Sequence, residues 1–254
     1  MTEELLYQIR DGIGFITLNR PAARNALTFA MYERLAAIAT DPGGARALVI
    51  TGAGEKAFAA GTDISQFQSF TTAEDAIAYE SKLDRILSAL ETCPIPVIAA
   101  VGGACTGGGA GIAAACDLRL AAPTARFGFP IARTLGNCLS MANIARLSAL
   151  IGPGRVTDMI FTARLLSAQE ALGVGFVSEL LPDHASLLAR AEALAHQVAG
   201  NAPLTLRVTK EAIRRLRTNL PPDEDLIRIC YTSEDFREGV AAFLGKRPPV
   251  WRGR

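Results

Sequence analysis

The stretch that decides the fold is residues 94–130, PIPVIAAVGGACTGGGAGIAAACDLRLAAPTARFGFP. No charged residue occurs in it before Asp117. The apolar run at 97–101 follows two prolines and predicts a short buried strand. Residues 102–107 are expected to form a turn, and the small apolar residues from 108 to 115 predict a tightly packed helix.

The glycine triplet at 107–109 is the least ordinary feature of this stretch. Three adjacent glycines lose much conformational entropy on folding, which is expected where the backbone passes close to a group that a Cβ would block. N–H groups at a helix N-terminus point outward and carry partial positive charge. The pattern therefore predicts backbone donors for a phosphate or for a carbonyl oxygen that gains negative charge. Close helix–sheet packing without a ligand is the alternative.

Other glycine-based sites do not fit the sequence. The run is mostly Ala and Gly, so it lacks the roughly 20 strongly apolar residues of a membrane span. Gly109, Gly111 and Ala114 match the dinucleotide pattern loosely, but they lie too far after the strand, and no acidic residue follows about 20 positions later. Neither GxxxxGK[ST] nor GxSxG occurs.

The composition indicates a globular intracellular protein. A chain of 254 residues with a net charge of +1 allows one large domain, and nothing suggests nucleic acid or a membrane surface as partner. The five scattered cysteines, without CxxC, indicate reduced thiols in the cytoplasm. His184 and His196 are expected to face solvent, so neither a histidine-based nucleophile nor a metal site is expected.

Strand and helix patterns alternate through the first part of the chain and predict an α/β fold with a parallel sheet. Strands are expected at 5–9, 13–18, 47–50, 117–121 and 175–178, with an unassigned segment at 126–129. Helices are expected at 28–40, 71–91 and 139–150 and from Ser167. Thr71 and Glu74 resemble a capping box for the second helix. From residue 183 onward the pattern is almost entirely helical. This divides the chain into an α/β core, 1–182, and a C-terminal helical region, 183–254.

Several short motifs, in this order and spacing, resemble the enoyl-CoA hydratase/isomerase (crotonase) superfamily over nearly the whole chain. They are NRP at 19–21, RNAL at 24–27, AFAAGTDI at 57–64, PVIAAV at 96–101, GGG at 107–109, CD at 116–117, FG at 127–128, LSAQEA at 166–171 and EGVAAF at 238–243. The resemblance implies a spiral of ββα turns, assembled as a homotrimer or a dimer of trimers through the C-terminal helices. It also implies an acyl-CoA thioester as substrate, with no further cofactor and no metal.

The resemblance assigns roles to particular residues. The backbone N–H groups of Thr62 and Gly108 would bind the thioester oxygen, which agrees with the donor site expected from the glycines. Coenzyme A would lie against the segments that contain Arg24, Ala26, Ala60, Asp63 and Ile64, with Lys246 near the nucleotide phosphates. Ordinary solvated charge is the alternative for Arg24 and Lys246, and an N-terminal helix cap is the alternative for Asp63.

The chain departs from the family pattern at two positions. Hydratases of the family carry two glutamates, which would correspond here to Gly111 and to Ile131, or to Ala132 if the following segment is one residue longer. None of these residues can transfer a proton. Arg133 could hold a substrate carboxylate and Asn137 could orient water, while Glu80 reaches the pocket only if its helix faces inward.

The sequence therefore predicts an acyl-CoA-binding enzyme that stabilises an enolate at an oxyanion hole but does not use the two-glutamate hydration mechanism. A decarboxylase or thioester hydrolase on the same fold is one alternative. A non-catalytic acyl-CoA-binding subunit is the other.

Overall fold

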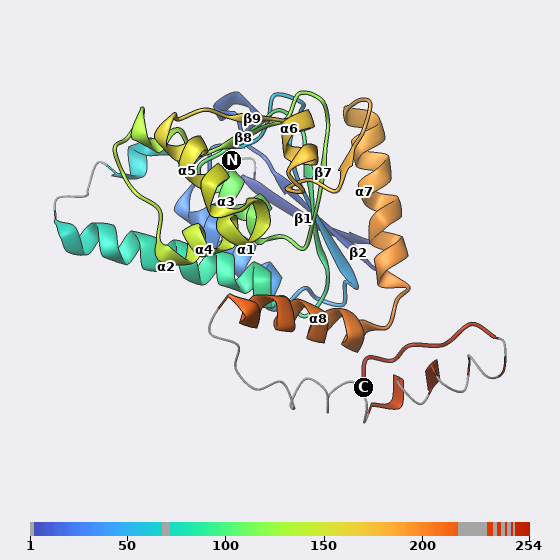
Figure 1. Ribbon diagram of the computed structural model, residues 1–254. Coiled ribbons are helices and arrows are strands. Elements are labelled where there is room, and N and C mark those ends of the chain that lie inside the picture. Colours follow the sequence, from blue (N-terminus) through green and yellow to red (C-terminus); the bar gives the residue numbers. More distant parts are fainter. Residues whose placement is uncertain are drawn as a thin grey trace.

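The computed structural model describes residues 3–67, 72–217, 233–235, 238–239, 242, 245 and 247–254 (Figure 1). In this part of the chain the strands form two sheets. The larger sheet contains β1 (Leu5–Arg10), β2 (Ile13–Leu18), β3 (Ala47–Gly52), β5 (Val97–Val101), β7 (Leu118–Ala121) and β10 (Glu179–Leu180), in that order. The smaller sheet contains β4 (Ala57–Ala60), β6 (Ala104–Thr106), β8 (Arg126–Gly128) and β9 (Leu166–Ser167).

Three successive passes of the chain build both sheets at once. Each pass contributes one strand to the larger sheet and the next strand to the smaller one: β3 and β4, then β5 and β6, then β7 and β8. Their pairings are parallel, whereas β1–β2 and β8–β9 are antiparallel. The helices α2 (Ala73–Thr92), α3 (Gly108–Ala115) and α4 (Met141–Ile151) follow these passes. The expected α/β class, with parallel sheets and a spiral of ββα turns, is confirmed.

The first hairpin and helix form where the sequence predicts them. Asp11 and Gly12 adopt positive φ angles of 50° and 76° at the turn between β1 and β2, a conformation that glycine tolerates best. Thr28 caps α1 (Phe29–Thr40) by accepting a hydrogen bond from the N–H of Met31 at 3.2 Å.

The central stretch folds as a buried strand, a short second strand and a tightly packed helix. Every residue of β5 is buried, and α3 begins at Gly108 as expected. Gly107 has a φ of 52°. A Cβ on Gly109 would collide with the backbone of Ala59, and one on Gly108 would collide with the hydroxyl of Tyr32. The glycine triplet therefore lets α3 pack closely against Ala59 and lets the backbone at Gly108 approach the hydroxyl of Tyr32.

The sequence patterns missed several elements. The expected turn at 102–107 contains β6, and the loop expected at 51–63 contains β4; strands this short carry little alternation. The helix α5 (Pro153–Phe161) was not expected. The strand expected at 175–178 is wrong, because the ladder forms at β10 instead. The capping box of α2 uses Thr72 and Asp75 rather than Thr71 and Glu74.

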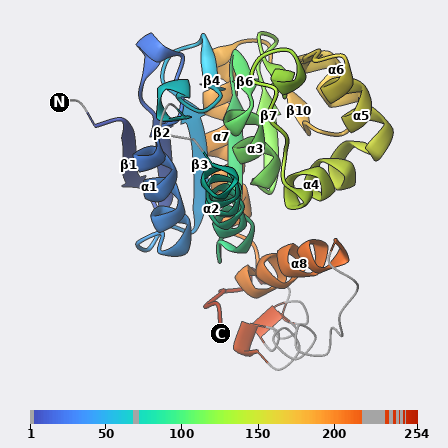
Figure 2. The ribbon, with the colours of Figure 1, turned by 90° about the vertical axis from the view of Figure 1, so that its left-hand side faces the viewer.

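Helices cover the sheets in distinct ways. α7 (His184–Ala199) packs Leu187, Ala191 and Leu194 against the larger sheet, beside which it stands in Figure 1. α6 (Ala168–Gly173) follows β9. α8 (Pro203–Leu216) lies beyond the end of α2, outside the sheet layers (Figure 2). The first helix after residue 182 is thus part of the core packing, and the division at 182/183 stays a prediction.

The two histidines differ from one another. His196 is exposed as expected. His184 is half-buried, because its ring packs where a Cβ of Gly102 would lie. Among the residues described, no helix is long and apolar enough to cross a membrane.

Candidate active site

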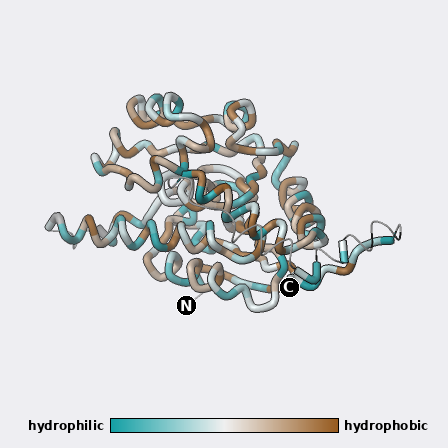
Figure 3. The backbone as a smooth tube through the Cα atoms, turned by 60° about the horizontal axis from the view of Figure 1, so that its bottom comes forward, coloured by the Kyte–Doolittle hydropathy of each residue, from teal (hydrophilic) through white to brown (hydrophobic). Residues whose placement is uncertain are grey.

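A cavity of about 200 Å³ opens where the start of α3, the inner face of α2 and the segment before α4 meet. Figure 3 shows hydrophilic and hydrophobic turns alternating along α2, the long helix at the left. The inner side of this helix supplies Tyr79, Glu80, Leu83 and Leu87 to the wall. The other lining residues used below are Tyr32, Ala60, Thr62, Ile64, Gly108, Gly111, Ile131 and Asn137.

The backbone N–H groups of Thr62 and Gly108 belong to this cavity. Gly108 is the first residue of α3, so its N–H has no acceptor within the helix. Thr62 lies opposite Leu27 in an isolated bridge, in which the N–H of Leu27 donates to Gly61 and the N–H of Asp63 donates to Leu27. Among the described residues the N–H of Thr62 has no backbone acceptor. A Cβ on Gly108 would lie 3.1 Å from Thr62 Oγ1. Thr62 and Gly108 are therefore neighbours in the cavity wall.

Three hydroxyl groups form a chain beside these donors. Thr62 Oγ1 lies 2.9 Å from the Tyr32 hydroxyl and 3.1 Å from the Tyr79 hydroxyl. Burial raises the pKa of Tyr32, and it raises the pKa of Tyr79 to about 12. Both tyrosines are therefore protonated at neutral pH and do not act as bases.

Among the described residues, Glu80 is the one carboxylate that lines the cavity. Its Oε2 is buried and has no hydrogen-bond partner among the described residues. Burial raises the pKa of this carboxyl, as does the charge of Asp84 one turn later, while the backbone amide of Ser140 acts in the opposite direction. Ser140 is held in place because its hydroxyl donates to Asp84 Oδ1 at 2.6 Å.

The positions at which glutamates were sought also line the cavity. A Cβ on Gly111 would meet only Leu87, at 3.4 Å, and Ile131 is 8% exposed. Ala132 is exposed and is not a lining residue. Neither Gly111 nor Ile131 carries a titratable group, so neither can supply the proton transfer for which a glutamate was sought there.

The structure brings some of the other predicted residues together and not others. Ala60, Ile64 and Asn137 line the cavity. Arg133 is exposed and outside the lining. Lys246 lies outside the described residues.

Three predicted coenzyme-binding residues lie in the loops near the cavity rather than in its wall. Arg24 is exposed and has a positive φ of 51°, and the carbonyl of Ala26 accepts a hydrogen bond from Arg20. Asp63 accepts hydrogen bonds from the N–H and the hydroxyl of Ser65 at 3.1 and 2.7 Å, and it also pairs with Arg20. Asp63 therefore serves as the cap that was the alternative for it.

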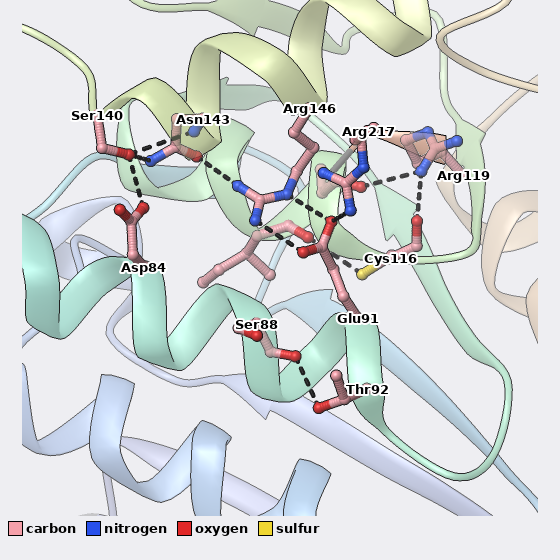
Figure 4. Close-up of polar contacts among 12 residues, drawn as sticks. Asp84, Ser88, Glu91, Thr92, Cys116, Arg119, Ser140, Asn143, Arg146 and Arg217 are labelled. Atoms are coloured by element: carbon pink, nitrogen blue, oxygen red, sulfur yellow. Dashed lines mark hydrogen bonds and ion pairs between the residues drawn. The ribbon is translucent and has the colours of Figure 1, made fainter. Parts of the chain in front are cut away.

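A second polar cluster lies at the other end of α2 (Figure 4). Glu91 accepts hydrogen bonds from Arg146 Nε and Nη2 at 2.7 and 2.9 Å and pairs with Arg217 as well. Arg146 also donates to Asn143 at 2.7 Å. Burial raises the pKa of Glu91, but the hydrogen bonds and charges of Arg146 and then Arg217 outweigh this, so that the net shift is downward. The carboxylate of Glu91 is thus shared by two arginines and is fully paired.

Comparison with known proteins identifies the family. The model of the family Enoyl-CoA hydratase/isomerase matches residues 8–254. The chain belongs to the enoyl-CoA hydratase/isomerase family. It is 35% identical over 243 residues to the short-chain-enoyl-CoA hydratase of Clostridium acetobutylicum, covering 92% of each protein. It is 32% identical to the crotonyl-CoA hydratase of Syntrophomonas wolfei, with 96% of each chain covered.

Solved structures of family members share the fold. An enoyl-CoA hydratase/isomerase family protein from Hyphomonas neptunium superimposes with a TM-score of 0.90 at 35% identity, covering 100% of this chain and 99% of that one. An enoyl-CoA hydratase/carnithine racemase from Magnetospirillum magneticum gives 0.89 at 34% identity, covering 100% and 97%. Membership of the family and its fold are therefore established over the whole chain.

The sequence patterns missed Tyr32 and Tyr79 and left Glu80 conditional. Glu80 stands three and seven positions before Leu83 and Leu87, which is the spacing of one helix face. That spacing was a usable signal that Glu80 faces inward. No comparable signal marked the tyrosines, because their hydroxyls meet Thr62 only through contacts distant in the chain.

Proposed function

We propose that this protein binds an acyl-CoA thioester and stabilises its enolate through the backbone N–H groups of Thr62 and Gly108. The supporting observation is that, in a member of this family, Thr62 and Gly108 are neighbours in the wall of one cavity and their N–H groups have no backbone acceptor within the described residues. Charge that develops on the thioester oxygen is stabilised by such preorganised donors, and each contributes roughly 10²–10³ in rate. Tyr32 and Tyr79 keep Thr62 in place beside the site.

The coenzyme would leave the cavity past Ala60 and Ile64, toward the loop that carries Arg24 and Ala26 and the cap residue Asp63. Ile64 is 59% exposed at the rim, so it offers an apolar surface without a protein neighbour. Lys246 is proposed to approach the phosphates. Assembly as a homotrimer or a dimer of trimers, and a cytoplasmic location, are part of the same proposal.

Two-glutamate hydration is not part of this function, because the cavity presents Gly111 and Ile131 where the family resemblance implies glutamates. A decarboxylase or hydrolase that uses Arg133 is less well supported, since this side chain is outside the cavity wall. Asn137 remains a candidate for orienting water. A purely binding subunit is the second candidate, and it is disfavoured by the buried Oε2 of Glu80, which has no hydrogen-bond partner among the described residues.

Calorimetry with acetyl-CoA and crotonyl-CoA tests the proposal. The wild-type protein should bind at least one of them, and Gly108→Val should abolish binding because the added Cβ collides with the Tyr32 hydroxyl. Gly154→Val is the matched control, since nothing lies within 4 Å of a Cβ there. Absence of binding to folded wild-type protein, or equal binding by Gly108→Val, would contradict the proposal.

A further inference from the structure

We propose that Glu80 is the catalytic residue that moves the proton at the α-carbon of the bound thioester. The inference rests on the proposed function, since it requires a thioester held by Thr62 and Gly108. It assigns to a residue of α2 the chemistry that the positions of Gly111 and Ile131 cannot supply.

The cavity wall contains few groups that could act as a base. A base that acts at neutral pH must be able to exist without its proton. Of the lining residues, only Tyr32, Tyr79 and Glu80 are titratable, and both tyrosines hold their protons. Glu80 is thus the single lining group able to accept a proton from a substrate carbon.

The carboxyl of Glu80 has one oxygen that is buried without a hydrogen bond among the described residues. Burying a carboxylate oxygen without a hydrogen bond is costly, and Oε2 of Glu80 is buried in that condition. Such an atom is expected where a ligand completes the site. Glu80 lines the same cavity as Thr62 and Gly108, so a thioester held by the N–H groups of those two residues would lie in the space that Glu80 also lines.

The surroundings suit a carboxyl that both takes and returns a proton. The charge of Asp84, on the same helix, adds to burial in raising the pKa of Glu80. The charge of Glu80 adds in turn to burial in raising the pKa values of Tyr32 and Tyr79. The backbone amide of Ser140 approaches from the segment before α4. Within the described ranges, no cationic side chain lines this cavity to fix Glu80 as a permanent anion. A carboxyl pKa moved upward, closer to the working pH, is the property a general base requires.

The proposed step balances as a simple proton transfer. The Cα–H bond breaks, the proton forms an O–H bond with the carboxylate of Glu80, and the electron pair passes into the enolate whose oxygen lies at Thr62 and Gly108. The reverse step returns the proton to carbon. One carboxyl performs removal and return, so the reaction class is exchange or shift of a proton next to the thioester rather than addition of water.

The experiment follows the exchange of α-hydrogens of acetyl-CoA and butyryl-CoA in D₂O by mass spectrometry, with binding measured separately by calorimetry. The wild-type protein should exchange the α-hydrogens of the thioester that it binds. Glu80→Gln should slow exchange by roughly 10²–10⁴, the usual contribution of a positioned base, and should keep its dissociation constant within about threefold. Glu74→Gln, an exposed residue of the same helix, is the matched control and should exchange as the wild type does.

The outcomes separate the two proposals. Binding without exchange by the wild type, or equal exchange by Glu80→Gln, overturns the role of Glu80 and leaves the proposed function standing. No binding of either thioester overturns the proposed function itself. If Glu80→Gln does not fold, the pH profile of the wild type decides: its exchange rate should rise through a single ionisation above pH 4.5, the ordinary value of this carboxyl, and a profile without it contradicts the proposal.

Discussion

Two glutamates of α2 lie in opposite electrostatic environments. Glu80 and Glu91 are eleven residues apart, which is close to three helical turns, so they lie on nearly the same face and about 16 Å apart along the axis. Glu91 is bound by two arginines, and its pKa is shifted downward. Glu80 has an oxygen without a partner, and its pKa is shifted upward. Glu91 therefore anchors α2 to its neighbours, whereas, in the part of the chain described, the carboxyl of Glu80 is left free of a counter-charge.

The difference shows how to distinguish a structural from a functional buried carboxylate. At Glu91 the carboxylate has two cationic partners, and the cluster links α2 to α4 and to the end of α8 (Figure 4). At Glu80 the protein supplies a cavity in place of a counter-charge. A carboxylate that is fully paired resists protonation, whereas one left unpaired can exchange its proton.

The largest expected effect concerns hydration of crotonyl-CoA. Even with Glu80 acting at the α-carbon, the described part of the chain places no second carboxylate in the cavity wall to activate water. The wild-type rate should therefore be at least roughly 10²–10⁴ below that of a relative with both glutamates. The measurement is the loss of enoyl-thioester absorbance, with such a hydratase as control. A rate within about tenfold of the control, a gap of only about 1.4 kcal/mol, would show that another residue activates water.

The next effect separates the two glutamates by stability. Glu91→Gln leaves Arg146, whose side chain is 4% exposed, without its counter-charge, and should lower the free energy of unfolding by about 3 kcal/mol, as broken buried pairs do. Glu80→Gln removes a charge that has no partner and should cause no loss. Urea denaturation of the two variants makes the comparison, and equal losses would show that Glu80 is structural as well.

The smallest effect is the pH dependence of stability. Because the folded-state pKa of Glu91 lies below 4.5, its contribution is present above pH 4.5 and is lost as the pH falls through the lowered pKa. The folded-state pKa of Glu80 lies above 4.5, so stability declines as the pH rises from 4.5 through that value. Glu91→Gln should remove the first decline and Glu80→Gln the second. Unfolding free energies measured between pH 3 and 8 check this, and a decline above pH 4.5 that persists in Glu80→Gln would contradict it.

The sequence was sufficient for the parts of the fold that local chemistry dictates. The strand at Val97–Val101, the glycine start of α3 and the cap at Thr28 are set by neighbouring residues, and each was predicted. Short strands such as β4 and β6 were missed, because their pairing partners are distant in the chain.

In the candidate site, too, the sequence predicted the backbone groups but not the contacts between distant side chains. Thr62 and Gly108 were predicted as donors from the glycine pattern and the family resemblance, because their role depends on backbone N–H groups. The neighbours of Glu80 depend on how α2 packs against α1 and the segment before α4. The absence of a partner at Oε2 is a property of three-dimensional packing, and no residue pattern records it.

The central claim is that one bound thioester lies between the N–H groups of Thr62 and Gly108 and the carboxyl of Glu80. A crystal structure with butyryl-CoA bound measures this directly. The account predicts the thioester oxygen at about 2.7–3.1 Å from both backbone nitrogens and the α-carbon at about 3–3.5 Å from an oxygen of Glu80. A thioester oxygen bound elsewhere, or a Glu80 carboxylate turned away and paired with another side chain, would contradict it.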